Sequence, residues 1–149
     1  MSRTWILVAN RVRARLLEFD DRERSVSELD DFLNPDGRAP SGSRGENRPP
    51  RTMDRMGPGR HAIEPHTVPA TKHAARFARE LATMLEDGRV HHRFEQLVLI
   101  ATPRFLGHLR QNMSPPLREN VHREIRRDMT RGAAKSIQAA AMSPFAHPV

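Results

Sequence analysis

Arginine side chains that could bind an anion are concentrated in the middle of this 149-residue chain. Six of them lie between residues 35 and 68, and three further basic side chains follow in a segment with a helical pattern. The guanidinium group is planar, always charged and shaped to donate two hydrogen bonds to phosphate or carboxylate oxygens. This pattern predicts a phosphate-binding surface for RNA. Its residues are Arg38, Arg44, Arg48, Arg51, Arg55, Arg60, Lys72, Arg76 and Arg79.

The overall charge agrees with this prediction and also fits a simpler alternative. The formal net charge is +7, and lysine occurs only at Lys72 and Lys135, so nearly every cation is an arginine. A chain that uses Arg in place of Lys throughout could carry these side chains merely as solvated loop residues. Six Phe, one Trp and no Tyr offer few rings for base stacking, so an RNA ligand should be held by its backbone.

Sequence patterns for other chemistries are missing. There is no GxxxxGK[ST] or GxGxxG phosphate loop, no Cys, and no HxxxH or HExxH spacing among the eight His. GxSxG is absent as well, and the paired carboxylates Asp20-Asp21 and Asp30-Asp31 lie at expected turns or strand ends. We therefore expect no metal site, no cofactor and no catalytic residue.

The elements that would position the basic residues begin with three expected strands. TWILVAN (4–10) is a short aliphatic run typical of a buried strand, and ARLLEFD (14–20) follows closely enough to form an antiparallel hairpin through residues 10–13. SVSELDDFLNPDG (25–37) predicts a third, edge strand that ends at an Asn-Pro-Asp-Gly turn.

A helix is expected next, over residues 71–88. Phe77, Leu81, Met84 and Leu85 form one apolar stripe, with Thr71 as the N-cap and Gly88 as the C-terminal stop. The residues after it predict a buried strand (94–102), a short helix (103–113), a break at SPPLRENV, a charged edge strand (122–129) and a final helix (130–142). This order predicts an α/β fold with a mixed sheet and flanking helices.

Residues 35–68 interrupt this pattern with six Pro and five Gly, so we expect one domain over residues 1–149 that carries a long, flexible, basic loop. No apolar run is long enough to span a bilayer, and the apolar stretch near the N-terminus is too short for a signal peptide. We expect a cytoplasmic protein that does not bind membranes. Its oligomeric state is left open, although the edge strand at 122–129 would favour pairing.

Five segments resemble a known family in order along the chain: WILVANRVRARLLEF, NPDGR, KHAARFARELATML, LVLIATPRFLGHLR and VHREIRRDMT. They are similar to the bacterial proteins named as required for attachment to host cells. That family resembles the middle domain of the eukaryotic and archaeal peptide-chain release factor. The resemblance implies a ribonuclease-H-like α/β fold.

In the release-factor domain, a basic loop ends in Gly-Gly-Gln before a helix with Arg-Phe-Ala-Arg. The helix motif matches Arg76-Phe77-Ala78-Arg79, whereas Ala70-Thr71-Lys72 stands where Gly-Gly-Gln would be. The resemblance thus implies a non-catalytic translation factor that binds the ribosome, tRNA or rRNA, with a translational GTPase as a possible further partner.

Two alternatives to a translation factor stay open. The family's name implies a host-cell attachment or interaction protein whose basic loop contacts a protein or an acidic glycan. A hydrolase of RNA or peptidyl-tRNA is the third prediction, and it carries the least weight because no catalytic pattern is present.

Overall fold

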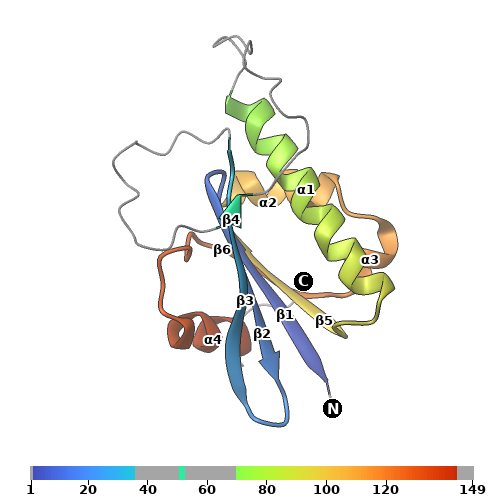
Figure 1. Cartoon of the computed structure of the whole chain (residues 1–149), viewed down its shortest axis with the longest axis vertical. Coiled ribbons are helices and arrows are strands. Elements are labelled where there is room, and N and C mark those ends of the chain that lie inside the picture. Colours follow the sequence, from blue (N-terminus) through green and yellow to red (C-terminus); the bar gives the residue numbers. More distant parts are fainter. Residues whose placement is uncertain (1, 36–50, 53–69, 144–149) are drawn as a thin grey trace.

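A computed structural model describes residues 2–35, 51–52 and 70–143, with residues 51–52 described by their backbone (Figure 1). The predicted loop at 35–68 therefore lies almost entirely outside the described residues. The strands are β1 (Arg3–Ala9), β2 (Arg13–Asp20), β3 (Ser25–Leu33), β4 (Arg51–Thr52), β5 (Gln96–Ala101) and β6 (Val121–Arg126). The helices are α1 (Ala70–Val90), α2 (Pro103–Gln111), α3 (Pro115–Glu119) and α4 (Ala134–Met142).

All strands belong to one mixed sheet in the order β4-β3-β2-β1-β5-β6. β1, β2 and β3 form an antiparallel meander, while β5 runs parallel to β1 and β6 runs parallel to β5. The α/β class with a mixed sheet is confirmed. The two strands predicted as edges differ: β6 is terminal in the sheet, whereas β3 pairs over two residues with β4. The prediction that residues 35–68 lack secondary structure is wrong at β4, because residues 51 and 52 pair in parallel with the end of β3.

Hydrophobic cores lie on both faces of the sheet, because successive side chains of a strand point to opposite faces. Trp5, Leu7 and Ala9 of β1 pack under α1, α2 and α3, whereas Ile6 and Val8 pack in the second core with α4. Figure 1 shows α1, α2 and α3 on one side of the strands and α4 on the other. The sheet is thus a layer between helices.

Helix α1 is longer than the sequence predicts at both ends. It begins at Ala70, so Thr71 lies inside it, and it continues to Val90, past Gly88. Gly88 is a packing residue rather than a stop, because a Cβ there would lie 2.6 Å from Cζ3 of Trp5. The Trp5 ring also packs on Phe94, with 4.8 Å between the ring centroids.

A further correction concerns SPPLRENV, where the sequence predicts a break. Residues Pro115–Glu119 form α3, and the Oγ of Ser114 accepts a hydrogen bond from the Leu117 amide as its N-cap. Proline is suited to the first turn of a helix, since its missing N–H would have no partner there. Among the described residues, no helix is both long and apolar enough to cross a membrane.

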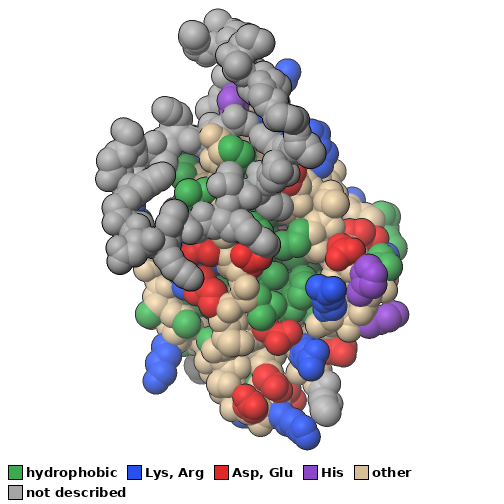
Figure 2. Space-filling view, viewed as in Figure 1, with side chains coloured by type: hydrophobic (Ala, Val, Ile, Leu, Met, Phe, Trp, Pro, Cys, Tyr) green, Lys and Arg blue, Asp and Glu red, His purple; other side chains and the backbone are tan. Residues whose placement is uncertain are grey.

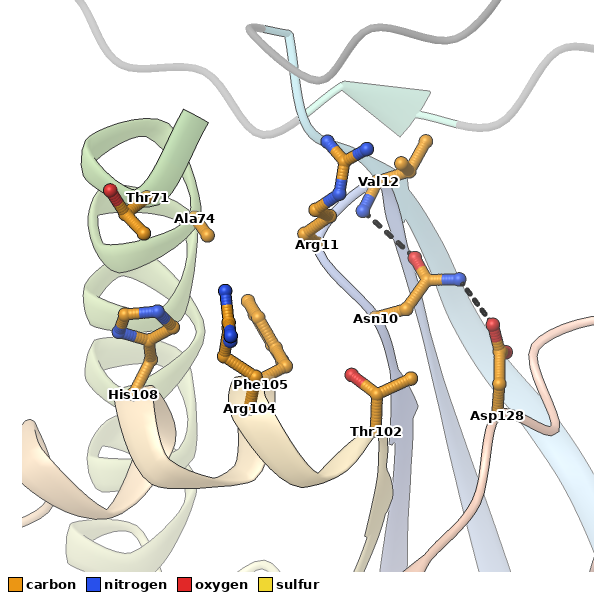
Figure 3. Close-up of a pocket in the computed structure, with 10 residues that line it drawn as sticks. All are labelled: Asn10, Arg11, Val12, Thr71, Ala74, Thr102, Arg104, Phe105, His108 and Asp128. Atoms are coloured by element: carbon orange, nitrogen blue, oxygen red, sulfur yellow. Dashed lines mark hydrogen bonds between the residues drawn. The ribbon is translucent and has the colours of Figure 1, made fainter. Parts of the chain in front are cut away.

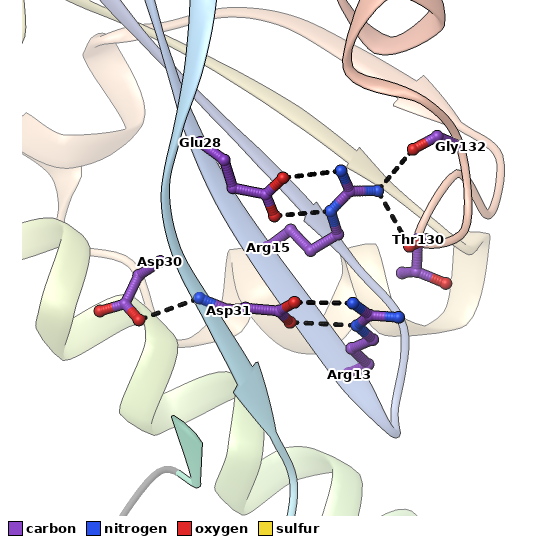
Figure 4. Close-up of polar contacts among 7 residues, drawn as sticks. All are labelled: Arg13, Arg15, Glu28, Asp30, Asp31, Thr130 and Gly132. Carbon is purple, nitrogen blue, oxygen red and sulfur yellow. Dashed lines mark hydrogen bonds and ion pairs between the residues drawn. The ribbon is translucent and has the colours of Figure 1, made fainter. Parts of the chain in front are cut away.

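Two arginines of β2 form ion pairs with β3 (Figure 4). Arg13 donates to both carboxylate oxygens of Asp31, at 3.0 and 2.6 Å. The side chain of Arg15 is only 9 % exposed and donates to both oxygens of Glu28, at 2.8 Å each. Its Nη1 donates hydrogen bonds to the carbonyls of Thr130 and Gly132, so Arg15 links the loop after β6 to the sheet.

Candidate functional site

A cavity of about 500 Å³ lies where β1 and β5 end, beside the first turns of α1 and α2 (Figure 3). We call it the strand-end cavity. The carboxyl ends of parallel strands are the usual ligand position in open α/β sheets, because the connections there leave a crevice. This volume is in the range of pockets that hold small organic ligands.

Asn10 shapes the first wall of the cavity, the turn between β1 and β2. Its Oδ1 accepts hydrogen bonds from the amides of Val12 and Arg13, both at 2.8 Å. Its Nδ2 donates to Asp128 at 2.9 Å and to Thr130 at 3.3 Å. Asn10 thus fixes a tight turn that places Arg11, an exposed residue, at the cavity.

Helix α2 forms the second wall and begins directly after β5. Pro103 starts the helix, and the side chain of Thr102 makes no capping hydrogen bond. Arg104 is exposed at the first turn, whereas Phe105 is 1 % exposed and packs against Phe77 of α1. The cavity therefore has an apolar floor beneath a charged rim.

His108 lies one turn further along α2. Its ring meets Phe105 edge-on, with 6.3 Å between the centroids. Among the described residues, its buried Nε2 has no hydrogen-bond partner. A buried nitrogen without a hydrogen-bond partner lowers the stability of the fold, so His108 is suited to form a hydrogen bond with a bound molecule.

Asp128 supplies a carboxylate on the opposite side of the cavity (Figure 3). Partial burial alone would raise the pKa of Asp128, but hydrogen bonds from Asn10 and Thr130 and the charge of Arg131 lower it below its ordinary value. Asp128 is therefore ionised at neutral pH, and both of its oxygens already accept hydrogen bonds from the protein.

The balance of charge at the cavity is positive. Within the described parts of the chain, the guanidinium groups of Arg11 and Arg104 take part in no hydrogen bond or ion pair. Asp128 is the one carboxylate among the residues that line the cavity, and its oxygens already accept hydrogen bonds from Asn10 and Thr130. On the face shown in Figure 2, by contrast, basic and acidic side chains are interspersed. The cavity is thus suited to an anionic molecule.

The predicted binding residues lie partly elsewhere. Arg38, Arg44, Arg48, Arg55 and Arg60 are outside the described residues, and only the backbone of Arg51, in β4, is described. Lys72 and Arg79 are exposed on α1, and Arg76 between them is half-buried and has an interaction partner. The spacing of these three places them along one side of the helix, and we call them the α1 stripe. The role of the whole set stays a prediction.

Sequence reasoning missed Arg11, Arg104 and His108 as site residues. Two signals were present, since Asn10 and Thr102 are the last residues of the two predicted buried strands, and Pro103 follows the second of them directly. What the sequence does not show is that β1 and β5 are parallel neighbours, which brings both strand ends to the same edge.

A comparison with protein families gives one match. The family model described as "Protein required for attachment to host cells" matches residues 5–140. No curated protein matches the chain. The family resemblance read from the sequence is confirmed, while its further link to the release-factor domain is not shown.

This match corrects the functional prediction. A translation-associated factor that binds RNA or the ribosome is contradicted, because the family is described by attachment to host cells and nothing in the match indicates translation. The alternative prediction, an attachment or interaction protein, agrees better with the match. The ribosome, tRNA or rRNA and GTPase partners stay untested predictions.

Proposed function

Because the chain belongs to the family of proteins required for attachment to host cells, we propose that it acts in attachment as a protein that binds an acidic glycan. The family match over residues 5–140 is the observation that carries this proposal. The net charge of +7 supports an anionic ligand, since long-range attraction raises the rate and strength of binding to polyanions.

The α1 stripe is the proposed contact surface. A helix rises 1.5 Å per residue, so the side chains from Lys72 to Arg79 form a row of cations about 10 Å long. The first turn of α1 holds no acidic residue to oppose this charge. Such a row suits a linear polymer with repeated carboxylate or sulfate groups better than a neutral glycan. The arginines of residues 35–68 belong to the same proposal on charge alone.

Binding to immobilised polymers tests the proposal. The full chain should be retained on a polyuronate or sulfated polysaccharide resin and not on neutral dextran, with retention that falls as salt rises. Replacing Lys72 and Arg79 by Gln should weaken retention, whereas the matched control, Arg22→Gln with Arg93→Gln, removes two exposed charges and should weaken it less. Equal loss in both double variants would show that net charge alone is responsible.

An attachment assay tests the biological part. Cells that lack the gene should adhere to host cells less than the parent strain does. The wild-type gene should restore adhesion, and the Lys72→Gln/Arg79→Gln gene should restore it only in part. Full restoration by that variant would remove the α1 stripe from the proposal, even if the gene itself proves necessary.

The finer fold assignment belongs to the same proposal. We propose one domain over residues 1–149 with a ribonuclease-H-like fold, as in the release-factor middle domain. The mixed sheet between two helical layers supports it.

A further inference from the structure

We propose that the strand-end cavity is a second binding site, which holds a small hydroxylated organic anion such as a sugar phosphate or a sugar acid. This site is separate from the α1 stripe, because α1 contributes Thr71 and Ala74 to the cavity and none of the three basic residues of the stripe. Binding in the strand-end cavity therefore does not depend on glycan binding by the α1 stripe.

Two guanidinium groups at this cavity are in no ion pair with a described residue. Arg11 comes from the β1–β2 turn and Arg104 from the first turn of α2, so two independent elements bring guanidinium groups to one cavity. Arg13 and Arg15 of β2, by contrast, are each paired with a carboxylate of β3. Two guanidinium groups without such partners are the arrangement that holds a phosphate or carboxylate.

The start of α2 brings further N–H donors to the same cavity. The first backbone amide of this helix to make an i→i−4 hydrogen bond is that of Leu106, which donates to the Thr102 carbonyl. The amides of Arg104 and Phe105 precede it, and Thr102 does not cap them with its side chain. Together with the guanidinium groups they add N–H donors and a positive partial charge at the same place.

The cavity is larger than an inorganic anion needs. At about 500 Å³ it has room for an organic body, and Val12, Ala74 and Phe105 provide an apolar lining for it. The unpartnered Nε2 of His108 and the carboxylate of Asp128 offer hydrogen bonds to hydroxyl groups on that body. An oxyanion attached to a hydroxylated ring uses all of these groups.

Calorimetric titration of the full chain tests the site with four probes: glucose 6-phosphate, glucuronate, inorganic phosphate and glucose. We expect glucose 6-phosphate or glucuronate to bind more tightly than inorganic phosphate, and glucose not to bind. The two anionic probes distinguish a phosphate site from a carboxylate site. Absence of binding by both, or equal affinity for inorganic phosphate, would overturn the inference.

Variants locate the site. Arg104→Gln and Arg11→Gln should each weaken binding about tenfold or more, because each removes a charge-assisted hydrogen bond. Arg22→Gln is the matched control. Arg22 is an exposed arginine in the β2–β3 turn, which lies at the end of β2 opposite to the cavity. Unchanged affinity in both cavity variants would overturn the assignment.

Amide chemical shifts provide a readout that does not depend on substitutions. Addition of the bound probe should move the resonances of Thr71, Thr102 and Arg104, and leave residues 21–24 unmoved. Shifts confined to Lys72, Arg76 and Arg79 would instead place the anion on the α1 stripe and refute a separate site. Melting temperatures of the variants close to that of the wild type exclude unfolding as the cause of lost binding.

Discussion

The side-chain amide of Asn10 donates a hydrogen bond to Asp128 across 2.9 Å, which joins the end of β1 to a residue 118 positions later in the chain. The same side chain accepts two amide hydrogen bonds within its own turn. One residue therefore fixes the β1–β2 turn and holds Asp128 beside it, and its loss should lower both stability and binding at the strand-end cavity.

We expect Asn10→Ala to lower the free energy of unfolding by about 2–3 kcal/mol, because several hydrogen bonds worth about 1 kcal/mol each are lost. Urea denaturation measures this change. Asn120→Ala is the control, since its Nδ2 makes a single exposed hydrogen bond to the Glu95 carbonyl and should cost less than about 1 kcal/mol. An equal effect in both variants would contradict the role assigned to Asn10.

Two helical glycines should respond to alanine in opposite directions. Gly88→Ala places a methyl group against the indole of Trp5 and should destabilise by about 1–3 kcal/mol. Gly107→Ala in α2 meets no atom within 4 Å and should stabilise by about 0.5–1 kcal/mol, through the helix propensity of alanine. Thermal unfolding of both variants gives the comparison, and a stabilising Gly88→Ala would refute the packing argument.

Arg15 should matter more for stability than the other arginine ion pairs. Arg15→Met removes the donors to Glu28 and leaves the Thr130 and Gly132 carbonyls without them, so a loss of about 2–4 kcal/mol is expected. Arg24→Met breaks an ion pair whose side chains are 73 % and 55 % exposed, together with a cation–π contact to Phe19, and should change stability by less than about 1 kcal/mol. A double-mutant cycle with Glu28→Gln would measure the part due to that pair alone.

Stability should fall in acid partly through Asp128. Its pKa is lowered by the hydrogen bonds of the folded state, so the unfolded chain binds this proton more readily. The stabilisation is complete above the ordinary pKa of 3.8 and is lost as pH falls through the lower folded value. Asn10→Ala, which removes one of these donors, should shift the Asp128 carboxyl titration upward in NMR. An unshifted titration would show that the Asn10 bond does not hold the pKa down.

Features of the fold that are set by residues close together in the sequence could be predicted. The aliphatic runs of β1 and β5 and the apolar stripe of α1 indicate their own structure, because burial of such residues is a local pattern. Gly88 wrongly suggests the end of the helix, because the side chain that requires a glycine there is Trp5, which lies far away in the chain. Two successive prolines likewise suggest a break, although Ser114 before them is a regular N-cap.

The candidate site was harder to predict for a physical reason. Abundance of arginine directs attention to residues 35–68, whereas the cavity contains only isolated basic residues at turns. Arg11 and Arg104 gain meaning only when β1 and β5 pair in parallel, and no local pattern encodes that pairing. The arginine content therefore predicted an anionic ligand, but it did not indicate the strand-end cavity as a site.

The central position of β1 has a consequence for how the chain is made. β2 can pair with it as soon as a short hairpin has left the site of synthesis, but its other neighbour begins only at Gln96. Until then one row of backbone groups on an apolar strand is open to any passing segment, including the same strand of another nascent copy. The slow step of maturation should thus be insertion of β5 beside β1, and crowded synthesis should favour aggregates joined through β1.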